Sequence, residues 1–194
     1  MEKELKIRLR DSAKDFIRGV QPALEARLKV KIFPIEDVEN SELLKLLDQV
    51  GIDGFYYDDG QIRGLASRVN YHEHARKTPA FTFRFALWVD ELNSWDGDRE
   101  FARKIKAFKS PKEFNFLPRI HVESFSKGKG TGLIGWSFAA ELKDVLEYYH
   151  RYYSDRDRIR IFEPRFGERR KVLSIPIEPF SKEYPILDVK VGNF

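Results

Sequence analysis

A tight-turn signal in the first third of the chain constrains the fold more than any other feature of the sequence. Asp58-Asp59-Gly60 separates two runs that resemble β-strands, at residues 52–57 and 61–71. An Asp-Gly pair between two such runs is typical of a two-residue β-hairpin turn, whose central residues adopt positive φ. The sequence therefore predicts an antiparallel hairpin here and argues against a helix across either run.

Helices and further strands are predicted on both sides of this hairpin. Apolar residues recur at helical spacing in residues 3–27, with Pro22 at a break, and in residues 41–50, 98–108 and 140–153. Alternating or aromatic-rich runs predict strands at residues 28–32, 81–89, 119–126, 131–139, 159–162 and 171–177. We expect residues 81–89 to add a third strand to the hairpin as an antiparallel meander, after a polar loop at residues 72–79. The predicted class is α/β (α+β), with a mixed, mainly antiparallel sheet flanked by helices.

Length and composition set the domain organisation and exclude several kinds of site. The 194 residues can bury one sizeable core, and we predict one α/β domain at residues 1–154 with a C-terminal extension, residues 155–194, packed on it. The absence of cysteine excludes disulfides, thiol nucleophiles and Cys-type zinc sites. No run approaches the roughly 18 apolar residues that a membrane span needs. We expect no membrane span and a cytoplasmic location.

Charge is dense but nearly balanced, so any nucleic-acid surface must be local. The chain has 35 Lys and Arg against 31 Asp and Glu, a net charge of +4. Basic residues interleaved with aromatic residues such as Trp88 suit phosphate contacts and base stacking. The predicted phosphate contacts are Arg63, Arg99, Arg103, Lys104 and Lys106. The alternative is that these residues form solvated helix faces. The densest basic run, residues 165–171, predicts an exposed turn able to hold RNA, DNA or an acidic protein.

Asp53 is the first candidate for chemistry. It is predicted to lie on a strand that follows a helix, facing a strand that carries Arg63, Ser67 and Arg68. A carboxylate in such a place commonly holds a hard divalent cation for phosphodiester hydrolysis. The alternative is structural: Asp53 caps a turn or neutralises Arg68.

The order of elements over residues 41–126 resembles the core of the PD-(D/E)XK nuclease-like superfamily, a restriction-endonuclease-like fold. The resemblance implies that Asp53 and a Glu-x-Lys or Gln-x-Lys on the next strand bind Mg²⁺ and activate water. The next strand reads Leu65-Ala66-Ser67-Arg68, so Arg68 takes the lysine position while Ala66 stands where the second acid belongs. Asp48 and Glu100 are then the candidates to supply the missing carboxylate.

The resemblance leads to two functional hypotheses. The first is a nucleic-acid-processing protein that hydrolyses phosphodiesters with Mg²⁺, in which Asp53, Arg68 and Glu100 are catalytic and Asp53, Asp48 and Glu100 bind the metal. The alternative is a non-catalytic module that binds a nucleic acid or an acidic protein partner, for which Ala66 is harmless.

A histidine motif offers a different metal site. In an extended segment His72 and His74 of His72-Glu73-His74 would point to one side, and His121 could complete a zinc site. The neighbouring Arg76 and Lys77 favour a solvated loop instead.

Overall fold

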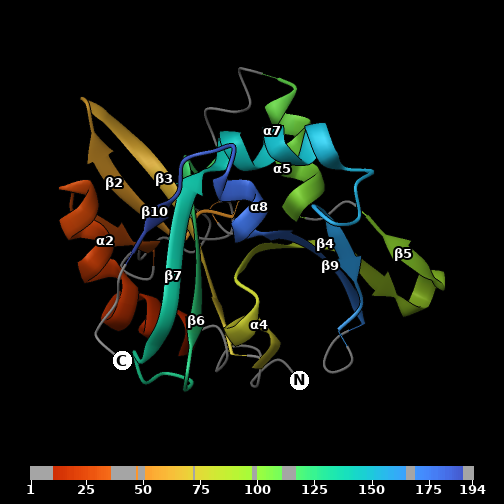
Figure 1. Cartoon of the computed structure of the whole chain (residues 1–194), viewed down its shortest axis with the longest axis horizontal. Helices are drawn as coiled ribbons and strands as arrows, with labels where there is room; N and C mark the ends of the chain where they lie inside the picture. The colour runs from red at the N-terminus through yellow and green to blue at the C-terminus, as the bar shows by residue number, and fades with distance from the viewer. Residues whose placement is uncertain are drawn as a thin grey trace.

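The computed structural model of the chain contains two β-sheets with helices packed around them (Figure 1). It describes residues 11–35, 47, 51–71, 73–97, 100–110, 117–164 and 169–189. The helix predicted at residues 41–50 lies outside the described residues, apart from Leu47, which is helical. No helix in these described ranges is long and apolar enough to span a membrane.

The larger sheet has six strands and is mixed. Its strands, in spatial order, are β1 (Ile32–Pro34), β2 (Gly54–Asp58), β3 (Gln61–Asn70), β6 (Ile120–Ser126), β7 (Ile134–Glu141) and β10 (Leu187–Asp188). β3 and β6 run parallel, and the other neighbours are antiparallel. The predicted hairpin is confirmed, because Asp58 pairs with Gln61 and the turn residues Asp59 and Gly60 have φ of +47° and +74°.

The smaller sheet has four antiparallel strands in the order β5 (Ser94–Asp96), β4 (Ala80–Val89), β9 (Arg170–Pro176) and β8 (Arg160–Phe162). A bulge between Arg84 and Ala86 curls it. The predicted meander is wrong, since β4 pairs with β5 and β9 and not with β3. The predicted loop at residues 72–79 contains α4 (Glu73–Lys77), and this helical connection lets the chain leave the first sheet.

Helices cover one face of the six-stranded sheet. Residues 11–15 are helical and continue into η1 (Phe16–Val20), a π-helical turn, and α2 (Gln21–Leu28), where Pro22 lies in the first turn. Phe16, Val20 and Leu24 pack against sheet residues that include Leu65 and Val122, which form one core. The strand predicted at residues 28–32 is mostly wrong: α2 runs to Leu28, Lys29 is left-handed, and β1 begins at Ile32.

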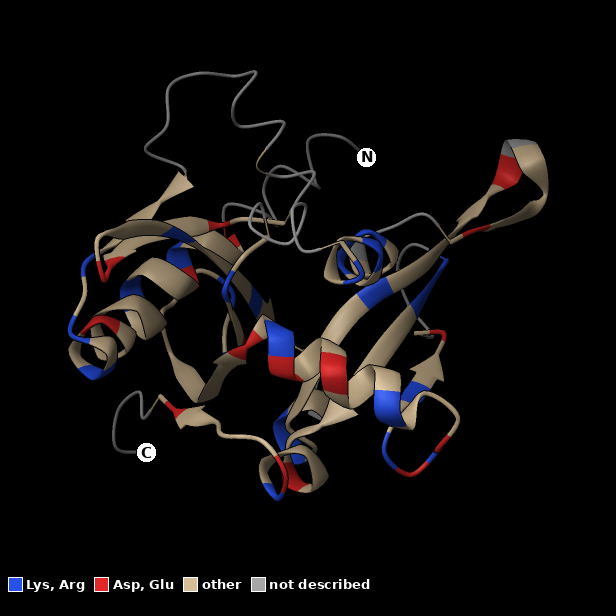
Figure 2. Ribbon diagram, turned by 90° about the horizontal axis from the view of Figure 1, so that it is seen from above, with Lys and Arg blue, Asp and Glu red and all other residues tan. Residues whose placement is uncertain are grey.

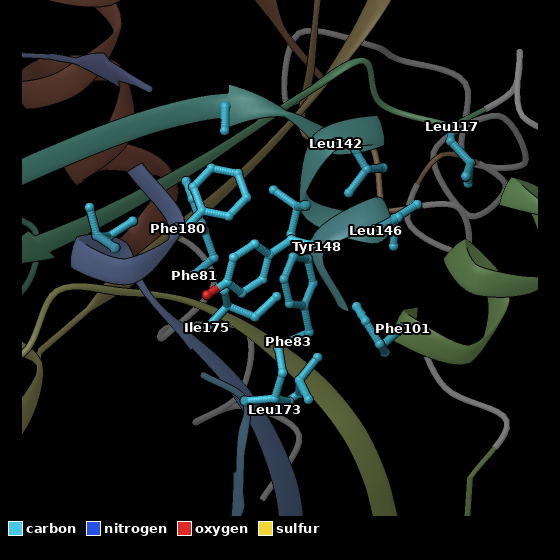
Figure 3. Packing of buried hydrophobic residues seen from close by; sticks show 14 of the residues in the cluster. Phe81, Phe83, Phe101, Leu117, Leu142, Leu146, Tyr148, Leu173, Ile175 and Phe180 are labelled. Carbon is cyan, nitrogen blue, oxygen red and sulfur yellow. The ribbon is translucent and has the colours of Figure 1, made fainter. Parts of the chain in front are cut away.

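A second core fills the space beside the curled sheet (Figure 3). It is covered by α5 (Glu100–Phe108), α7 (Leu142–Tyr152) and α8 (Ile177–Ser181). The side chains that meet there are Phe81, Phe83, Phe101, Leu142, Leu146, Tyr148, Leu173, Ile175 and Phe180. The predicted β6–β7 hairpin and α7 are confirmed. The segment after residue 154, predicted as an extension, supplies β8 and β9 to one sheet and β10 to the other.

Candidate functional site

Asp53 lies just before β2 and caps the edge of β3. Its backbone N–H donates to Leu65 O at 2.8 Å, and its Oδ2 accepts from the backbone N–H of Ser67 at 2.6 Å. β2 begins at Gly54, opposite Leu65, so no β2 residue lies beside Ser67. The carboxylate of Asp53 extends the hydrogen-bond ladder by one step. This geometry matches the structural alternative in which Asp53 acts as a cap.

The sheet register shows which residues share a face with Asp53. Ala66, Arg68 and Asn70 alternate onto one face of β3, and the parallel register places His121 beside Ala66 and Glu123 beside Arg68. Continuing the β2–β3 register by one residue puts Asp53 opposite Ala66. Asp53 and Arg68 therefore share a face, as the nuclease-like hypothesis requires.

Glu123 is the centre of a buried polar group on this face. It is 0% exposed and accepts four hydrogen bonds, two of them from Thr82: its backbone N–H at 3.0 Å and its hydroxyl at 2.5 Å. The other donors are Asn70 Nδ2 at 2.5 Å and His121 Nε2 at 3.1 Å. Thr82 belongs to β4, so this carboxylate joins the two sheets. We call Asn70, Thr82, His121 and Glu123 the Glu123 cluster.

The surroundings of the Glu123 cluster are aromatic. The His121 ring lies 4.5 Å from the ring of Phe83, and Lys104 Nζ lies 5.4 Å from the centre of the same ring. Lys104 is only 1% exposed, so the prediction that it contacts phosphate is wrong. Its position explains the burial: it follows Phe101 by three residues and therefore shares the buried stripe of α5.

The predicted metal sites include several side chains that lie outside the described residues. No group of three or more His, Asp or Glu among them is arranged to hold a metal ion. Asp48, His72 and the side chains of His74 and Glu100 lie outside the described residues. Glu73 and His74 begin helix α4, so the extended geometry predicted for the histidine motif is wrong at these two residues.

The predicted phosphate contacts do not form one surface. Arg103 and Lys106 are exposed on α5, whereas Arg99 lies outside the described residues. Arg63 is on the β2–β3 hairpin, where its Nε lies 3.4 Å from Asp58 Oδ2. By strand alternation Arg63 also points to the opposite face of β3 from Arg68. Only Arg103 and Lys106 remain together as exposed cations.

A group of aromatic and basic residues that sequence reasoning did not assemble lies at one end of the curled sheet. Trp88 of β4 pairs with Trp95 of β5, with ring centres 5.5 Å apart and planes at 78°. The Arg169 guanidinium carbon lies 3.8 Å from the centre of the Trp88 ring, and Lys171 Nζ lies 4.3 Å from that of Trp95. We call these four residues the tryptophan–cation cluster. Trp88 and the basic run at residues 165–171 were visible in the sequence, but their contact depends on the pairing of β9 with β4.

This cluster and α5 lie on the same side of the curled sheet. Lys171 is two residues before the core residue Leu173 and pairs with Ala86, which is two residues before Trp88. The period-two rule therefore places Trp88 on the face that α5 covers. Figure 2 shows α5 beside β4 and the β4–β5 hairpin projecting away from the rest of the molecule.

Two of the charged groups among the described residues thus differ in their surroundings: one is buried around Glu123, and the other lies beside the tryptophan pair. No protein-family model matches the chain, and no curated protein or solved structure is significantly similar to it.

Proposed function

We propose that this protein binds nucleic acid through the tryptophan–cation cluster and the exposed side of α5. The observation that carries the proposal is the arrangement of two indole rings from neighbouring strands, with Lys171 of β9 and Arg169, the residue just before β9, held over them. None of these four residues belongs to either hydrophobic core, and Arg169 is exposed. An aromatic group with adjoining cations, outside the cores, is suited to a partner that is both anionic and aromatic.

The charges in this region suit a polyanion. Arg169 and Lys171 are joined on the same side of the sheet by the exposed Arg103 and Lys106 of α5. Acids also occur in these elements: Asp90, Glu91 and Asp96 in the β4–β5 hairpin and Glu100 at the start of α5. Cations that neutralise phosphates release condensed counterions, which supplies sequence-independent affinity.

Binding is better supported than hydrolysis. The carboxylate of Glu123, which lies beside Arg68 in the register, accepts four hydrogen bonds inside the protein. The carboxylate of Asp53 accepts from Ser67 N. The restriction-endonuclease-like core, and Mg²⁺-dependent cleavage by Asp53, Arg68 and Glu100, stay untested predictions. A non-catalytic binding module needs no carboxylate for a metal, so it is compatible with the hydrogen bonds that Glu123 and Asp53 make within the protein.

A salt titration tests the proposed function. Binding of a fluorescent single-stranded oligonucleotide is measured by anisotropy for the wild type and for the double variant R169A/K171A. Each lost phosphate contact lowers the slope of log affinity against log salt by about 0.7 on a single strand, so we expect a decrease of about 1.4. Lys182 lies just after α8 and its side chain is 69% exposed, so Lys182→Ala is the matched control and should keep the wild-type slope.

Thermal melts of all three proteins show whether each is folded. Equal slopes for folded wild type and double variant would reject this surface as the binding site. If the wild type binds no oligonucleotide even at low salt, the proposed function is wrong, and an acidic protein becomes the partner to test.

A further inference from the structure

We propose, as a step that rests on the proposed function, that the tryptophan–cation cluster is a stacking platform that selects single-stranded over double-stranded nucleic acid. The two tryptophans lie directly opposite each other across the antiparallel β4–β5 pair. Directly opposite residues project from the same face of a sheet. Both indoles, which are half-buried, therefore lie together on the face that also carries Arg169 and Lys171.

The chemistry of the two indoles distinguishes the two forms of nucleic acid. Bases of a single strand can turn their faces outward and stack on aromatic side chains, whatever their sequence. Bases inside a duplex are already stacked on one another and offer a protein only their edges and the phosphates. Trp88 and Trp95 therefore add affinity for a single strand and little for a duplex.

The cations complete the platform without depending on the form of the nucleic acid. The guanidinium of Arg169 lies 3.8 Å from the centre of the Trp88 ring and 5.5 Å from that of Trp95. The N–H groups of a guanidinium held over an indole can reach phosphate. Lys171, 4.3 Å from the Trp95 ring centre, supplies a point charge for the backbone. Loss of either cation should thus weaken single strands and duplexes alike.

The position of the cluster also favours an open strand. β4 continues past the core residues Phe81 and Phe83 to Val89, and its last three residues pair with the three residues of β5. The resulting hairpin projects from the body of the protein (Figure 2). Leu92, in the turn of this hairpin, is 69% exposed. A flexible single strand can follow such a projection, whereas a stiff duplex contacts it over a short length.

The experiment compares one oligonucleotide as a single strand and as a duplex, by anisotropy at one salt concentration. Wild type should bind the single strand more tightly. Trp95→Leu should weaken single-strand binding by about 5- to 150-fold, the usual effect of losing one stacked base, and leave duplex binding nearly unchanged. Trp95→Phe keeps an aromatic face and should recover part of the loss.

Intrinsic fluorescence gives a second measurement, which keeps Trp95 in place and so does not depend on whether Trp95 variants fold. The chain has three tryptophans, and the third, Trp136, donates its Nε1–H to Ala75 O at 3.0 Å, away from the cluster. In a Trp136→Phe protein the emission comes only from Trp88 and Trp95. Single-stranded oligonucleotide should quench it strongly, and duplex should quench it weakly.

The outcomes separate the two proposals. Equal affinity and equal quenching with both forms would overturn the stacking inference, while the salt effect of R169A/K171A would still support the proposed function. Binding to neither form would overturn both. A folded Trp95→Leu protein that loses duplex and single-strand affinity equally would also reject stacking.

Discussion

The Glu123 cluster and the tryptophan–cation cluster use charge in opposite ways. Glu123 is 0% exposed and accepts hydrogen bonds from both sheets, so its charge is used to fix their relative position. Arg169 and Lys171 lie outside both cores, over aromatic rings, where Arg169 is exposed and Lys171 is half-buried. The first cluster resembles a catalytic site by composition alone, whereas the second is the one that we propose contacts a partner.

Asp15 supports this interpretation of the buried acids. It is 0% exposed and accepts from the backbone N–H groups of Gly130 and Gly132, at 2.9 and 2.6 Å, and from the Tyr71 hydroxyl at 2.8 Å. Burial, followed by this hydrogen bond, raises the pKa of Tyr71 well above its ordinary value. Like Glu123 and Asp53, Asp15 satisfies backbone N–H groups. A buried carboxylate in this protein is therefore better explained by capping than by catalysis.

The largest effect is expected from Glu123→Ala, which removes the acceptor shared by Asn70, Thr82 and His121. Leaving these buried donors unsatisfied should lower the free energy of unfolding by about 3–5 kcal/mol, measured by urea denaturation. Glu123→Gln keeps one acceptor oxygen and should cost less. The folded fraction of either variant should bind oligonucleotide as the wild type does. If Glu123→Ala lowers the free energy of unfolding by less than about 1 kcal/mol, the charge of Glu123 does not fix the two sheets, and the contrast with the tryptophan–cation cluster is wrong.

The sequence predicted those parts of the fold that short-range rules govern. The Asp59-Gly60 turn, the β6–β7 hairpin and α7 follow from turn chemistry and local periodicity. The pairing of β4 with β9 joins residues about ninety positions apart and has no local signal. The tryptophan–cation cluster depends on that pairing, so it could not be assembled from the sequence.

The candidate site was only partly predictable for a related reason. The sequence predicted that Asp53 faces the strand of Arg68, and the strand register places both residues on one face. The burial of Glu123 and Lys104 was missed, since charged residues on strands and helices usually face solvent. The close spacing of His121 and Glu123 on either side of the apolar Val122 was the signal that could have identified a buried polar cluster.

Tyr56 lies buried in the same core as Leu65 and Val122. Ionisation of its hydroxyl should change the free energy of unfolding by about 2–3 kcal/mol. Burial, its main cause, raises the pKa of Tyr56 from 10.0 to about 12. The unfolded chain therefore loses this proton first, and stability contributed by Tyr56 is lost as the pH rises from about 10 to 12. Below pH 10 this titration contributes no change.

Tyr56→Phe removes that titration, so its unfolding free energy should fall less steeply over this pH window than that of the wild type. Urea denaturation at several pH values measures the difference. Tyr57→Phe, at an exposed neighbouring position, controls for the removal of one tyrosine. Parallel profiles for wild type and Tyr56→Phe would show that burial at this position does not couple ionisation to folding.

The smallest effect is expected at Asp53, which is only half-buried and shares a face with Glu123. Asp53 accepts a hydrogen bond from Ser67 N, so Asp53→Ala should lower the free energy of unfolding by about 1–2 kcal/mol. Asp53→Asn should lower it less, because its amide oxygen can still accept this bond. Oligonucleotide affinity and its salt dependence should stay at wild-type values. The nuclease-like hypothesis predicts the reverse: cleavage of the oligonucleotide in Mg²⁺, abolished in Asp53→Asn with stability unchanged. Incubating wild type and Asp53→Asn with labelled oligonucleotide and Mg²⁺, beside urea denaturation of both, separates a capping aspartate from a metal ligand in one comparison.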